Sequence, residues 1–198
     1  MFDRPFSQAC ENNRQPILEI LNRVLVDKKN LLEIGSGTGQ HAVYFAPRLS
    51  HLQWYTSDMP DKHLGIATWL KEAKVDNLHR PLTFSVSAIN TNVWPLDEVD
   101  AVYTANTTHI MQRSEAQLMM QLVADNLPSG GVFCQYGPYT FQGQHSSESN
   151  RAFNQHVIEQ GCGGIRDIDE LTLWSNNMAL VETVAMPANN FMLIWRKP

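Results

Sequence analysis

Three glycines follow an apolar run and an acidic residue in the segment LLEIGSGTGQ. They are Gly35, Gly37 and Gly39, and Glu33 stands two positions before the first of them. A glycine loop directly after a strand lets the backbone pass close under a bound nucleotide, because no Cβ stands in the way. The dinucleotide fingerprint GxGxxG has a glycine where this chain has Gln40, so the spacing GxGxG disfavours a nicotinamide dinucleotide and its oxidoreductases.

Two carboxylates accompany this loop. Glu33 lies at the end of the apolar run, and Asp58 comes 19 residues after Gly39, at the end of the next apolar segment. A carboxylate repels a pyrophosphate but attracts a sulfonium or a free amino group, so Glu33 favours a nucleoside that carries an amino acid. An acid at the position of Asp58 accepts hydrogen bonds from both ribose hydroxyls. The alternative is structural, with the glycines as a tight strand-to-helix turn and Asp58 as a surface residue.

The composition limits the classes of protein that fit. The chain has 198 residues, of which 43% are hydrophobic, and this predicts a single domain over 1–198. The net charge of −5 and the lack of a Lys/Arg cluster argue against nucleic acid as a partner. No apolar run approaches the ~18 residues of a membrane span, and the N-terminus lacks the apolar centre of a secretion signal. We therefore expect a cytoplasmic protein that has no membrane partner.

Cysteine and histidine spacing gives no metal site. The three cysteines are far apart and odd in number, which fits neither a disulfide framework nor a CxxC site. The seven histidines show no HExxH or HxH spacing. The sequence thus predicts no metal ligands.

Hydrophobic periodicity predicts alternating strands and helices. Strands are predicted at 31–34, 52–58, 81–88, 100–106, 131–137, 180–186 and 190–196. Helices are predicted at 16–25, 40–49, 62–73, 145–160 and 166–178, and a further one begins at a capping box of Ser114 with Gln117. Pro16 would lie in the first turn of its helix, and Asp61 would cap the helix at 62–73. Pro47 would end or kink the helix at 40–49.

This order of elements predicts a fold class. Five strand–helix alternations indicate a doubly wound, Rossmann-like α/β fold with right-handed crossovers. The last two strands are joined by three residues, so they form an antiparallel hairpin. A seven-stranded sheet with one antiparallel strand is the arrangement of S-adenosylmethionine-dependent methyltransferases.

The segment EIGSGTGQHAVYFA resembles motif I of the class I S-adenosylmethionine-dependent methyltransferases. Over essentially its full length, the chain also resembles an uncharacterised family of small methyltransferase-like proteins. That resemblance rests on the segments NNRQPILEIL, LLEIGSGTGQHAVYFA, YGPYTFQGQHSSESNRAF, RDIDEL and MPANN. It implies the fold and S-adenosylmethionine as cofactor, and leaves the methyl acceptor open.

The resemblance implies how the cofactor is held. Glu33 would face the methionine amino group, Gly35 and Gly37 would underlie the methionyl–ribose part, and Asp58 would hold the ribose. Many relatives have an aspartate near the end of the third strand to contact the adenine amino group, but this chain has Ser85-Val86-Ser87 there. From its position after the fourth strand, Asn106 is expected near the methionine part. The predicted cofactor-binding residues are Glu33, Gly35, Ser36, Gly37, Gly39, Asp58, Ser85, Val86 and Asn106.

Candidate groups for the methyl acceptor follow the fourth and fifth strands, where ligands of open α/β sheets lie. His109 is the best proton acceptor, by position and by its near-neutral reference pKa, and Tyr136 is a second catalytic candidate. Tyr139 and His145 follow. The alternative is that His109 caps or packs a helix and that the tyrosines are half-buried packing aromatics. The polar segment 138–165 is either a lid or plain surface structure.

The N-terminal helix offers Asn13 and Arg14 as a possible cover over the site, with a solvated arginine as the alternative. The segment NTTH after the fourth strand differs from the Asn/Asp-Pro-Pro-Tyr motif that serves amino groups of bases and glutamine. We expect a methyltransferase with a small-molecule acceptor, and protein substrates are less favoured. The rival hypothesis is a non-catalytic protein that binds S-adenosylmethionine or a similar nucleoside. The oligomeric state stays open.

Overall fold

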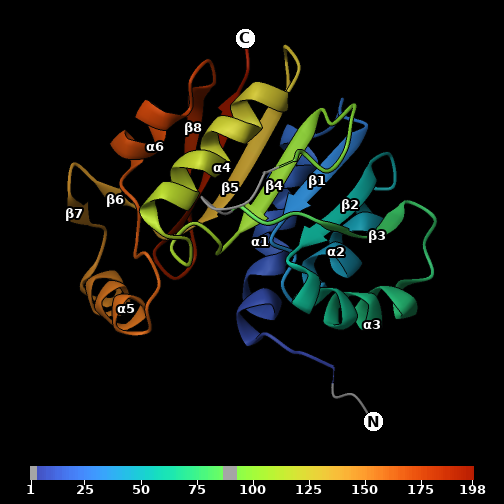
Figure 1. The fold of residues 1–198 in the computed structure, drawn as a ribbon, viewed down its shortest axis with the longest axis horizontal. Coiled ribbons are helices and arrows are strands. Elements are labelled where there is room, and N and C mark those ends of the chain that lie inside the picture. Colours follow the sequence, from blue (N-terminus) through green and yellow to red (C-terminus); the bar gives the residue numbers. More distant parts are fainter. Residues whose placement is uncertain (1–3, 87–92) are drawn as a thin grey trace. The chain divides into compact units, whose positions relative to one another are not determined.

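The computed structural model describes residues 4–86 and 93–198 (Figure 1). Within these residues, seven strands form a sheet in the hydrogen-bonded order β3-β2-β1-β4-β5-β9-β8. Strands β1, β2, β3 and β4 pair in parallel, whereas β9 is antiparallel to both β5 and β8. This confirms the predicted class I methyltransferase fold. The strands are β1 Asn30–Ile34, β2 Gln53–Asp58, β3 Leu78–Thr83, β4 Ala101–Ala105, β5 Val132–Gly137, β8 Ala179–Met186 and β9 Asn190–Arg196.

The chain divides into two compact units. Unit 1 comprises Met1–Ser85 and Val93–Thr104, and unit 2 comprises Val86–Asn92 and Ala105–Pro198. Whether they act as one domain over 1–198 stays a prediction.

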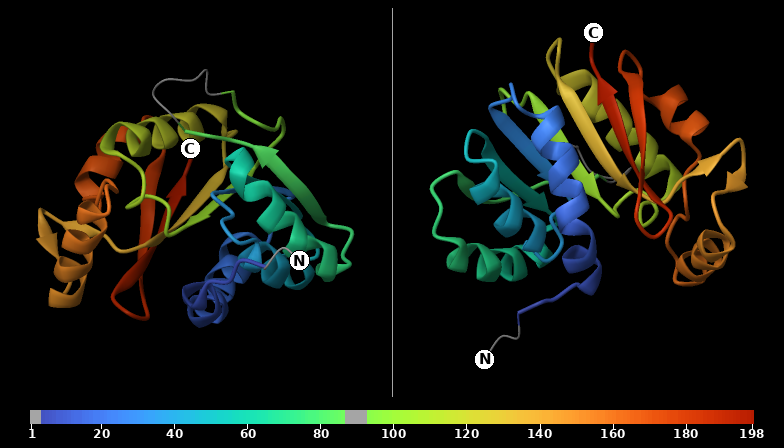
Figure 2. Two further views of the ribbon diagram at one scale, coloured as in Figure 1. Left: turned by 60° about the horizontal axis from the view of Figure 1, so that its bottom comes forward. Right: turned by 180° about the vertical axis from the view of Figure 1, so that it is seen from behind.

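Unit 1 holds the glycine loop. Its helices are α1 Gln8–Val24, α2 Gln40–Phe45 and α3 His63–Ala73, with short 3₁₀ turns at Ala46–Arg48 and Pro60–Lys62. The helices lie on one face of β1–β3, with α1 next to α2 and α2 next to α3 (Figure 2). α1 packs by apolar side chains at helical spacing, and β1 is buried along nearly its whole length, as parallel strands are. The core between these layers includes Ile17, Leu21, Leu32, Phe45 and Trp54.

Unit 2 is built on the hairpin of β8 and β9 beside β5. Its helices are α4 Arg113–Asn126, α5 Glu148–Glu159 and α6 Ile168–Trp174. In Figure 1, α4 lies in front of β5, and the view from behind in Figure 2 shows β5, β9 and β8 on the near side. Residues along β8 alternate in exposure, which is typical of an edge strand with one solvated face.

One predicted helix start and one predicted helix cap are wrong. α1 begins at Gln8, where Ser7 accepts the N–H of Cys10, so Pro16 lies inside the helix and not in its first turn. The interior proline is tolerated because Asn12, whose carbonyl loses its helical partner, is exposed. Asp61 does not cap α3, because it lies within the 3₁₀ turn that precedes the helix.

The predicted capping box of α4 is displaced by two residues. Gln112, not Ser114, is the N-cap, and Glu115, not Gln117, accepts the N–H of Gln112 at 2.8 Å. Glutamine is uncommon as an N-cap, whereas serine is one of the preferred residues. The prediction therefore chose Ser114, two residues too far along the chain.

Other boundaries agree with the predicted ones or differ by a few residues. The α-helix after the glycine loop ends before Pro47, as predicted. β3 ends at Thr83, earlier than the predicted strand at 81–88, whose last two residues lie outside the described ones. The segment 138–165 contains a hairpin of β6 Thr140–Phe141 and β7 Gln144–His145, followed by α5.

Candidate functional site

Residues 35–39 connect β1 to α2 in a backbone conformation that glycine favours. The angle φ is 70° at Gly35, 58° at Gly37 and 88° at Gly39, so all three lie in the left-handed region. A Cβ on Gly39 would also lie 3.2 Å from the Cα of Ile66 in α3. The glycines therefore shape the loop itself, besides leaving room for a ligand.

Asp58, at the C-terminal end of β2, is joined to this loop. Its Oδ2 accepts the N–H of Gly37 at 2.7 Å, and its Oδ1 accepts the N–H of Met59 at 2.7 Å. The side chain is half-buried, and each carboxylate oxygen can accept a further hydrogen bond. The structure thus brings together two residues that sequence reasoning placed at one site.

Glu33 lies beneath the loop with 2% of its surface exposed. Its Oε2 accepts the indole N–H of Trp54 at 3.0 Å and the hydroxyl of Ser36 at 3.0 Å. Burial raises the pKa of Glu33 to about 7, Asp58 adds to the rise, and the two donors partly offset it. The carboxyl therefore titrates near neutral pH.

Two residues of this site were missed by sequence reasoning. Trp54 holds Glu33 from the neighbouring strand, and Ser57 donates its hydroxyl to the Glu33 carbonyl at 2.6 Å. The carbonyl of Ser57 also accepts the N–H groups of Gly35 and Ser36, each at 3.0 Å. No local sequence signal marks them, because they meet Glu33 through the parallel register, which sets Glu33 against Thr56.

The chain after β3 follows the end of β2. Phe84 donates its N–H to the carbonyl of Asp58 at 3.1 Å and packs its ring on Trp94. Ser85 and Val86 come next and are half-buried. Ser87 lies outside the described residues. The role of Ser85 and Val86 in contacting an adenine stays a prediction.

Asn13 and Arg14 contact residues of α1 and α2. Asn13 Oδ1 lies 2.7 Å from His41 Nε2 in α2, and this pair is buried. Arg14 pairs with Glu11 at 2.5 Å and stacks over Tyr44. These residues attach α1 to α2, and their role as a cover over the site stays a prediction.

In unit 2, polar groups surround Gly137 at the end of β5. Asn106 has φ 57° and donates its N–H to the carbonyl of Tyr136 at 2.9 Å. A Cβ on Gly137 would lie 3.9 Å from Asn106 Oδ1 and 3.7 Å from the hydroxyl of Tyr139. The absence of a side chain at this position leaves space between an amide and a phenol.

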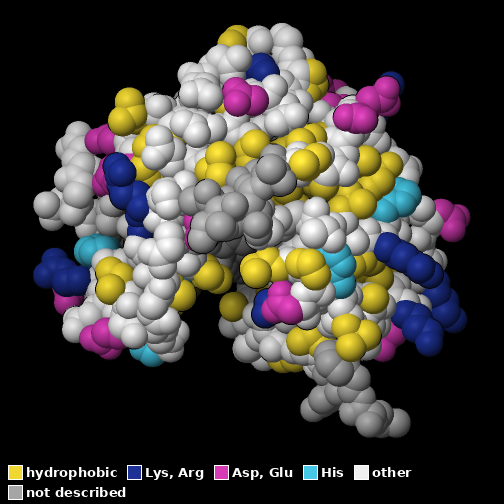
Figure 3. Space-filling view, viewed as in Figure 1, with side chains coloured by type: hydrophobic (Ala, Val, Ile, Leu, Met, Phe, Trp, Pro, Cys, Tyr) yellow, Lys and Arg dark blue, Asp and Glu magenta, His cyan; other side chains and the backbone are white. Residues whose placement is uncertain are grey.

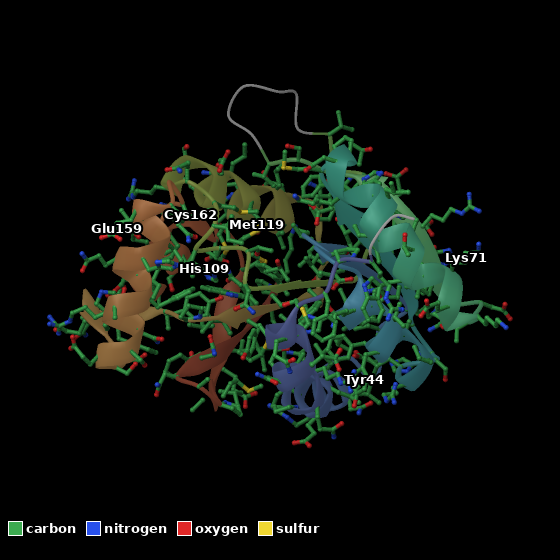
Figure 4. The ribbon with its side chains drawn as sticks, turned by 90° about the horizontal axis from the view of Figure 1, so that it is seen from below. Tyr44, Lys71, His109, Met119, Glu159 and Cys162 are labelled. Atoms are coloured by element: carbon green, nitrogen blue, oxygen red, sulfur yellow. The ribbon has the colours of Figure 1, made fainter. Side chains whose placement is uncertain are left out.

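His109 lies in the loop after β4, next to α5 (Figure 4). It is 7% exposed, and its ring meets Phe153 edge-to-face with centroids 5.2 Å apart. Burial lowers the pKa of His109 to about 4, so the expected near-neutral pKa is wrong. The imidazole is neutral at pH 7 and is able to accept a proton.

The loop that carries His109 is held by the segment after α5. Gly164 donates its N–H to the carbonyl of His109 at 3.0 Å, and Gly163 donates to the carbonyl of Ile110 at 3.3 Å. Arg166 donates in turn to the carbonyls of Gly163 and Gly164. The GCGG segment at 161–164, between two predicted helices, therefore supports the backbone of a candidate catalytic residue.

The two tyrosines are buried more deeply than the half-buried packing aromatics of the structural alternative. Tyr136 is 3% exposed and Tyr139 is 1% exposed. Tyr139 donates its hydroxyl to the Gln135 carbonyl at 3.3 Å, and burial raises the pKa of Tyr139, which keeps the phenol protonated. His145 lies in β7, and its Nδ1 is the buried side-chain atom of the described residues that lacks a hydrogen-bond partner.

Among residues 4–86 and 93–198, no group of three or more His, Cys, Asp or Glu side chains is placed to hold a metal ion. No helix in this described part of the chain is both long enough and apolar enough to cross a bilayer.

A family model described as "Protein of unknown function (DUF938)" matches residues 4–197. This match extends over nearly the whole chain.

Solved structures share the fold at low sequence identity. An O-methyltransferase family 2 protein from Planctomyces limnophilus, in complex with apigenin, has a TM-score of 0.82 at 14% identity, over 96% of this chain and 58% of its own. An O-methyltransferase family protein from Burkholderia thailandensis has a TM-score of 0.77 at 13% identity, over 92% of this chain and 55% of its own. Human N-acetylserotonin methyltransferase, in complex with S-adenosylmethionine, has a TM-score of 0.72 at 13% identity, over 93% of this chain and 54% of its own. This chain thus spans little more than half the length of these proteins.

Proposed function

Since this chain belongs to the DUF938 family of proteins of unknown function, we propose its activity from the fold and the site. It is an S-adenosylmethionine-dependent methyltransferase that acts on a small-molecule acceptor. The observation that carries this proposal is the pair of acids at the glycine loop, with Asp58 bound to Gly37 and Glu33 buried beneath. Human N-acetylserotonin methyltransferase, which has the same fold, was solved with this cofactor.

The residues of the loop fit the groups of the cofactor. Asp58 is half-buried and retains acceptor capacity for the ribose hydroxyls. Glu33 carries a carboxyl whose raised pKa falls back when an ammonium group approaches, because the opposite charge favours the ionised form. When bound, S-adenosylmethionine supplies a methyl group already activated on a sulfonium, so the protein mainly aligns the acceptor and removes a proton.

His109, in unit 2, is the candidate base of this proposal. His109 is neutral over the physiological range, so its imidazole is able to accept a proton from a hydroxyl acceptor, but its low pKa makes it a weaker base than an exposed histidine. Apolar side chains reach the surface around α5, where Phe153 and Ile158 are 38% and 51% exposed (Figure 3). An apolar surface next to the candidate base favours a small organic acceptor. The Planctomyces limnophilus protein, which shares the fold, was solved in complex with a small organic molecule, apigenin.

One observation favours a second candidate function, a cofactor-binding protein without turnover. His109 is 7% exposed and its ring is shielded by Phe153, so an acceptor must displace part of this packing to reach the imidazole. Binding at the glycine loop does not need that displacement.

The two candidates differ in a transfer experiment. The protein is incubated with methyl-labelled S-adenosylmethionine and a fractionated cell extract, and label is followed in the low-mass and protein fractions. We expect label in a low-mass fraction, lost with Asp58→Ala and retained with Asp61→Ala, which changes an exposed acid nearby. Cofactor binding without transfer to any fraction favours the second function. Transfer to protein alone contradicts the proposed acceptor class.

A further inference from the structure

The chain before and at the start of α1 forms a strap, residues 4–11, that is attached to α3. The indole N–H of Trp69 in α3 donates to the carbonyl of Pro5 at 2.7 Å. The Pro5 ring fills the space beside Gly65, where a Cβ would approach it to 2.8 Å, and Arg4 stacks over Trp69. Figure 1 shows this dark-blue segment passing beside α3 before it enters α1.

A second attachment joins the strap to the glycine loop through Gln40. Gln40 Oε1 accepts the N–H of Ser7 at 2.6 Å and the hydroxyl of Thr38 at 3.1 Å. Its Nε2 donates to the carbonyl of Ser7 at 3.3 Å and to Glu11 Oε1 at 2.8 Å. Gln40 is 3% exposed, so these bonds form away from bulk water.

These four bonds use the whole capacity of a primary amide, which has two donors and an acceptor with two lone pairs. A glutamate at this position would keep the acceptor but would place a carboxylate against Glu11 and the Ser7 carbonyl. A smaller residue would leave the polar groups of Ser7 and Glu11 without this partner. The site is therefore specific for glutamine among residues of its size.

Gln40 also belongs to the loop that it ties down. It directly follows Gly39, and Gly39 donates its N–H to the carbonyl of Ser36 at 2.8 Å. Thr38, one of its partners, lies within the loop. The glycine loop and the strap are thus connected through the backbone of residues 39–40 and the side chain of Gln40.

We propose that Gln40 is a positioning residue that couples docking of the strap to occupancy of the glycine loop. With the strap docked, the loop is held in its ligand-binding conformation; with the ligand bound, undocking of the strap is suppressed. This inference rests on the proposed function for the identity of the ligand, S-adenosylmethionine or its demethylated product S-adenosylhomocysteine.

The chain contains a natural reporter for the docked state. Cys10 lies in the first turn of α1 and is partly accessible, whereas Cys134 is fully buried. Burial raises the pKa of the Cys10 thiol, so docking also slows its alkylation. Replacing the third cysteine, Cys162→Ser, leaves Cys10 as the reactive thiol.

The experiment measures two quantities in the Cys162→Ser background. The first is the rate of Cys10 alkylation with and without S-adenosylhomocysteine, and the second is the Kd of that ligand by calorimetry. Gln40→Ala and Gln40→Glu should each raise the alkylation rate of the free protein at least about tenfold. The Kd of S-adenosylhomocysteine should rise by a similar factor. In the protein that keeps Gln40, the ligand should slow the alkylation of Cys10.

A matched control and a rescue separate this role from general destabilisation. Gln15→Ala removes the exposed hydrogen bond from the Tyr44 hydroxyl, elsewhere between α1 and α2, and should change both quantities less than about twofold. Adding Glu11→Gln to Gln40→Glu exchanges the donor and the acceptor between the two side chains. The double variant should therefore have a lower alkylation rate and a lower Kd than Gln40→Glu alone.

The outcomes distinguish this inference from the proposed function. If S-adenosylhomocysteine does not bind the Cys162→Ser protein, the proposed function fails, and the coupling to that ligand fails with it. If the ligand binds but the Gln40 variants keep the same Kd, the coupling is overturned although the proposed function stands. Unchanged Cys10 alkylation in folded Gln40 variants overturns the attachment itself.

Discussion

Gly37 donates its backbone N–H to Asp58 Oδ2 over 2.7 Å, and this bond fixes the loop after β1 to the end of β2. One carboxylate therefore both shapes the loop and presents acceptors beside it. Glu33 lies beneath, held by the indole of Trp54. This arrangement of two acids about one loop carries the proposed binding of a nucleoside with a cationic amino-acid part.

Replacing Asp58 tests the ribose side of the site. Asp58→Ala should weaken binding of S-adenosylhomocysteine by about 1.5–3 kcal/mol, the range for hydrogen bonds that involve a charged group. The loop also loses the acceptor for Gly37, so a modest fall in melting temperature should accompany the loss. Calorimetric titration gives the affinity.

Asp61→Ala is the matched control, because Asp61 pairs only with the neighbouring Lys62 among the contacts that the structure gives it and is exposed. Equal affinities of the Asp58 variant and the control would remove Asp58 from the site.

The buried carboxyl of Glu33 should make stability depend on pH. Its pKa is about 7 in the folded protein against an ordinary 4.5. Below about pH 4.5 the carboxyl is protonated in both the folded and the unfolded state, so it adds no pH dependence. Between about pH 4.5 and about pH 7 the unfolded chain has lost this proton while the folded protein keeps it, so stability falls across this window and levels off above it. Glu33→Gln keeps an acceptor for Trp54 and removes the charge. The melting temperature of the variant relative to the parent protein should therefore increase from about pH 5 to about pH 8. A constant difference across this range contradicts the raised pKa.

His109 should act as a base over an unusually wide pH range. If it takes the acceptor proton, His109→Ala lowers kcat by ~10²–10⁴ and leaves cofactor affinity nearly unchanged. Because burial lowers the pKa of His109 to about 4, kcat should stay level from about pH 8 down to about pH 5 before it falls. Initial rates with the acceptor identified by label transfer measure both effects.

His156→Ala provides the control, since His156 lies on α5 and contacts only Gln160 among the hydrogen bonds given for its ring. Normal kcat in a folded His109→Ala protein would show that His109 only packs against Phe153.

Gly163 should not accept a side chain. A Cβ there would lie 1.9 Å from the carbonyl oxygen of Met111, which is backbone and cannot rotate away. Gly163→Ala should therefore cost about 3 kcal/mol, the upper end of the usual range for overpacking. Gly161→Ala, two residues earlier, meets nothing within 4 Å and should show only the strain of its φ of 82°, about 1–2 kcal/mol. Denaturant unfolding compares them, and equal costs would argue against the tight contact.

Local patterns predicted the fold and the proximity of the glycine loop to Asp58. The period of apolar residues marked the strands, and the short PAN connection required the antiparallel hairpin that β8 and β9 form. The glycines and Asp58 are recognisable because the backbone geometry that they serve is local to one loop and one strand end.

The remaining features depend on contacts between distant segments. Nothing near Glu33 in sequence indicates that Trp54 will hold its carboxylate, since strand register decides it. Gln40 was noticed only as a missing glycine, because its partners Ser7 and Glu11 come from a helix whose start was predicted too late. The low pKa of His109 follows from burial next to Phe153, which the reference value of a histidine does not contain.

The most direct test of the central claim is a calorimetric titration of the unmodified protein with S-adenosylhomocysteine and, separately, with NAD. We predict saturable binding of S-adenosylhomocysteine at one site, at least about tenfold weaker in Asp58→Ala, and no binding of NAD. Binding of NAD without binding of S-adenosylhomocysteine would contradict the account.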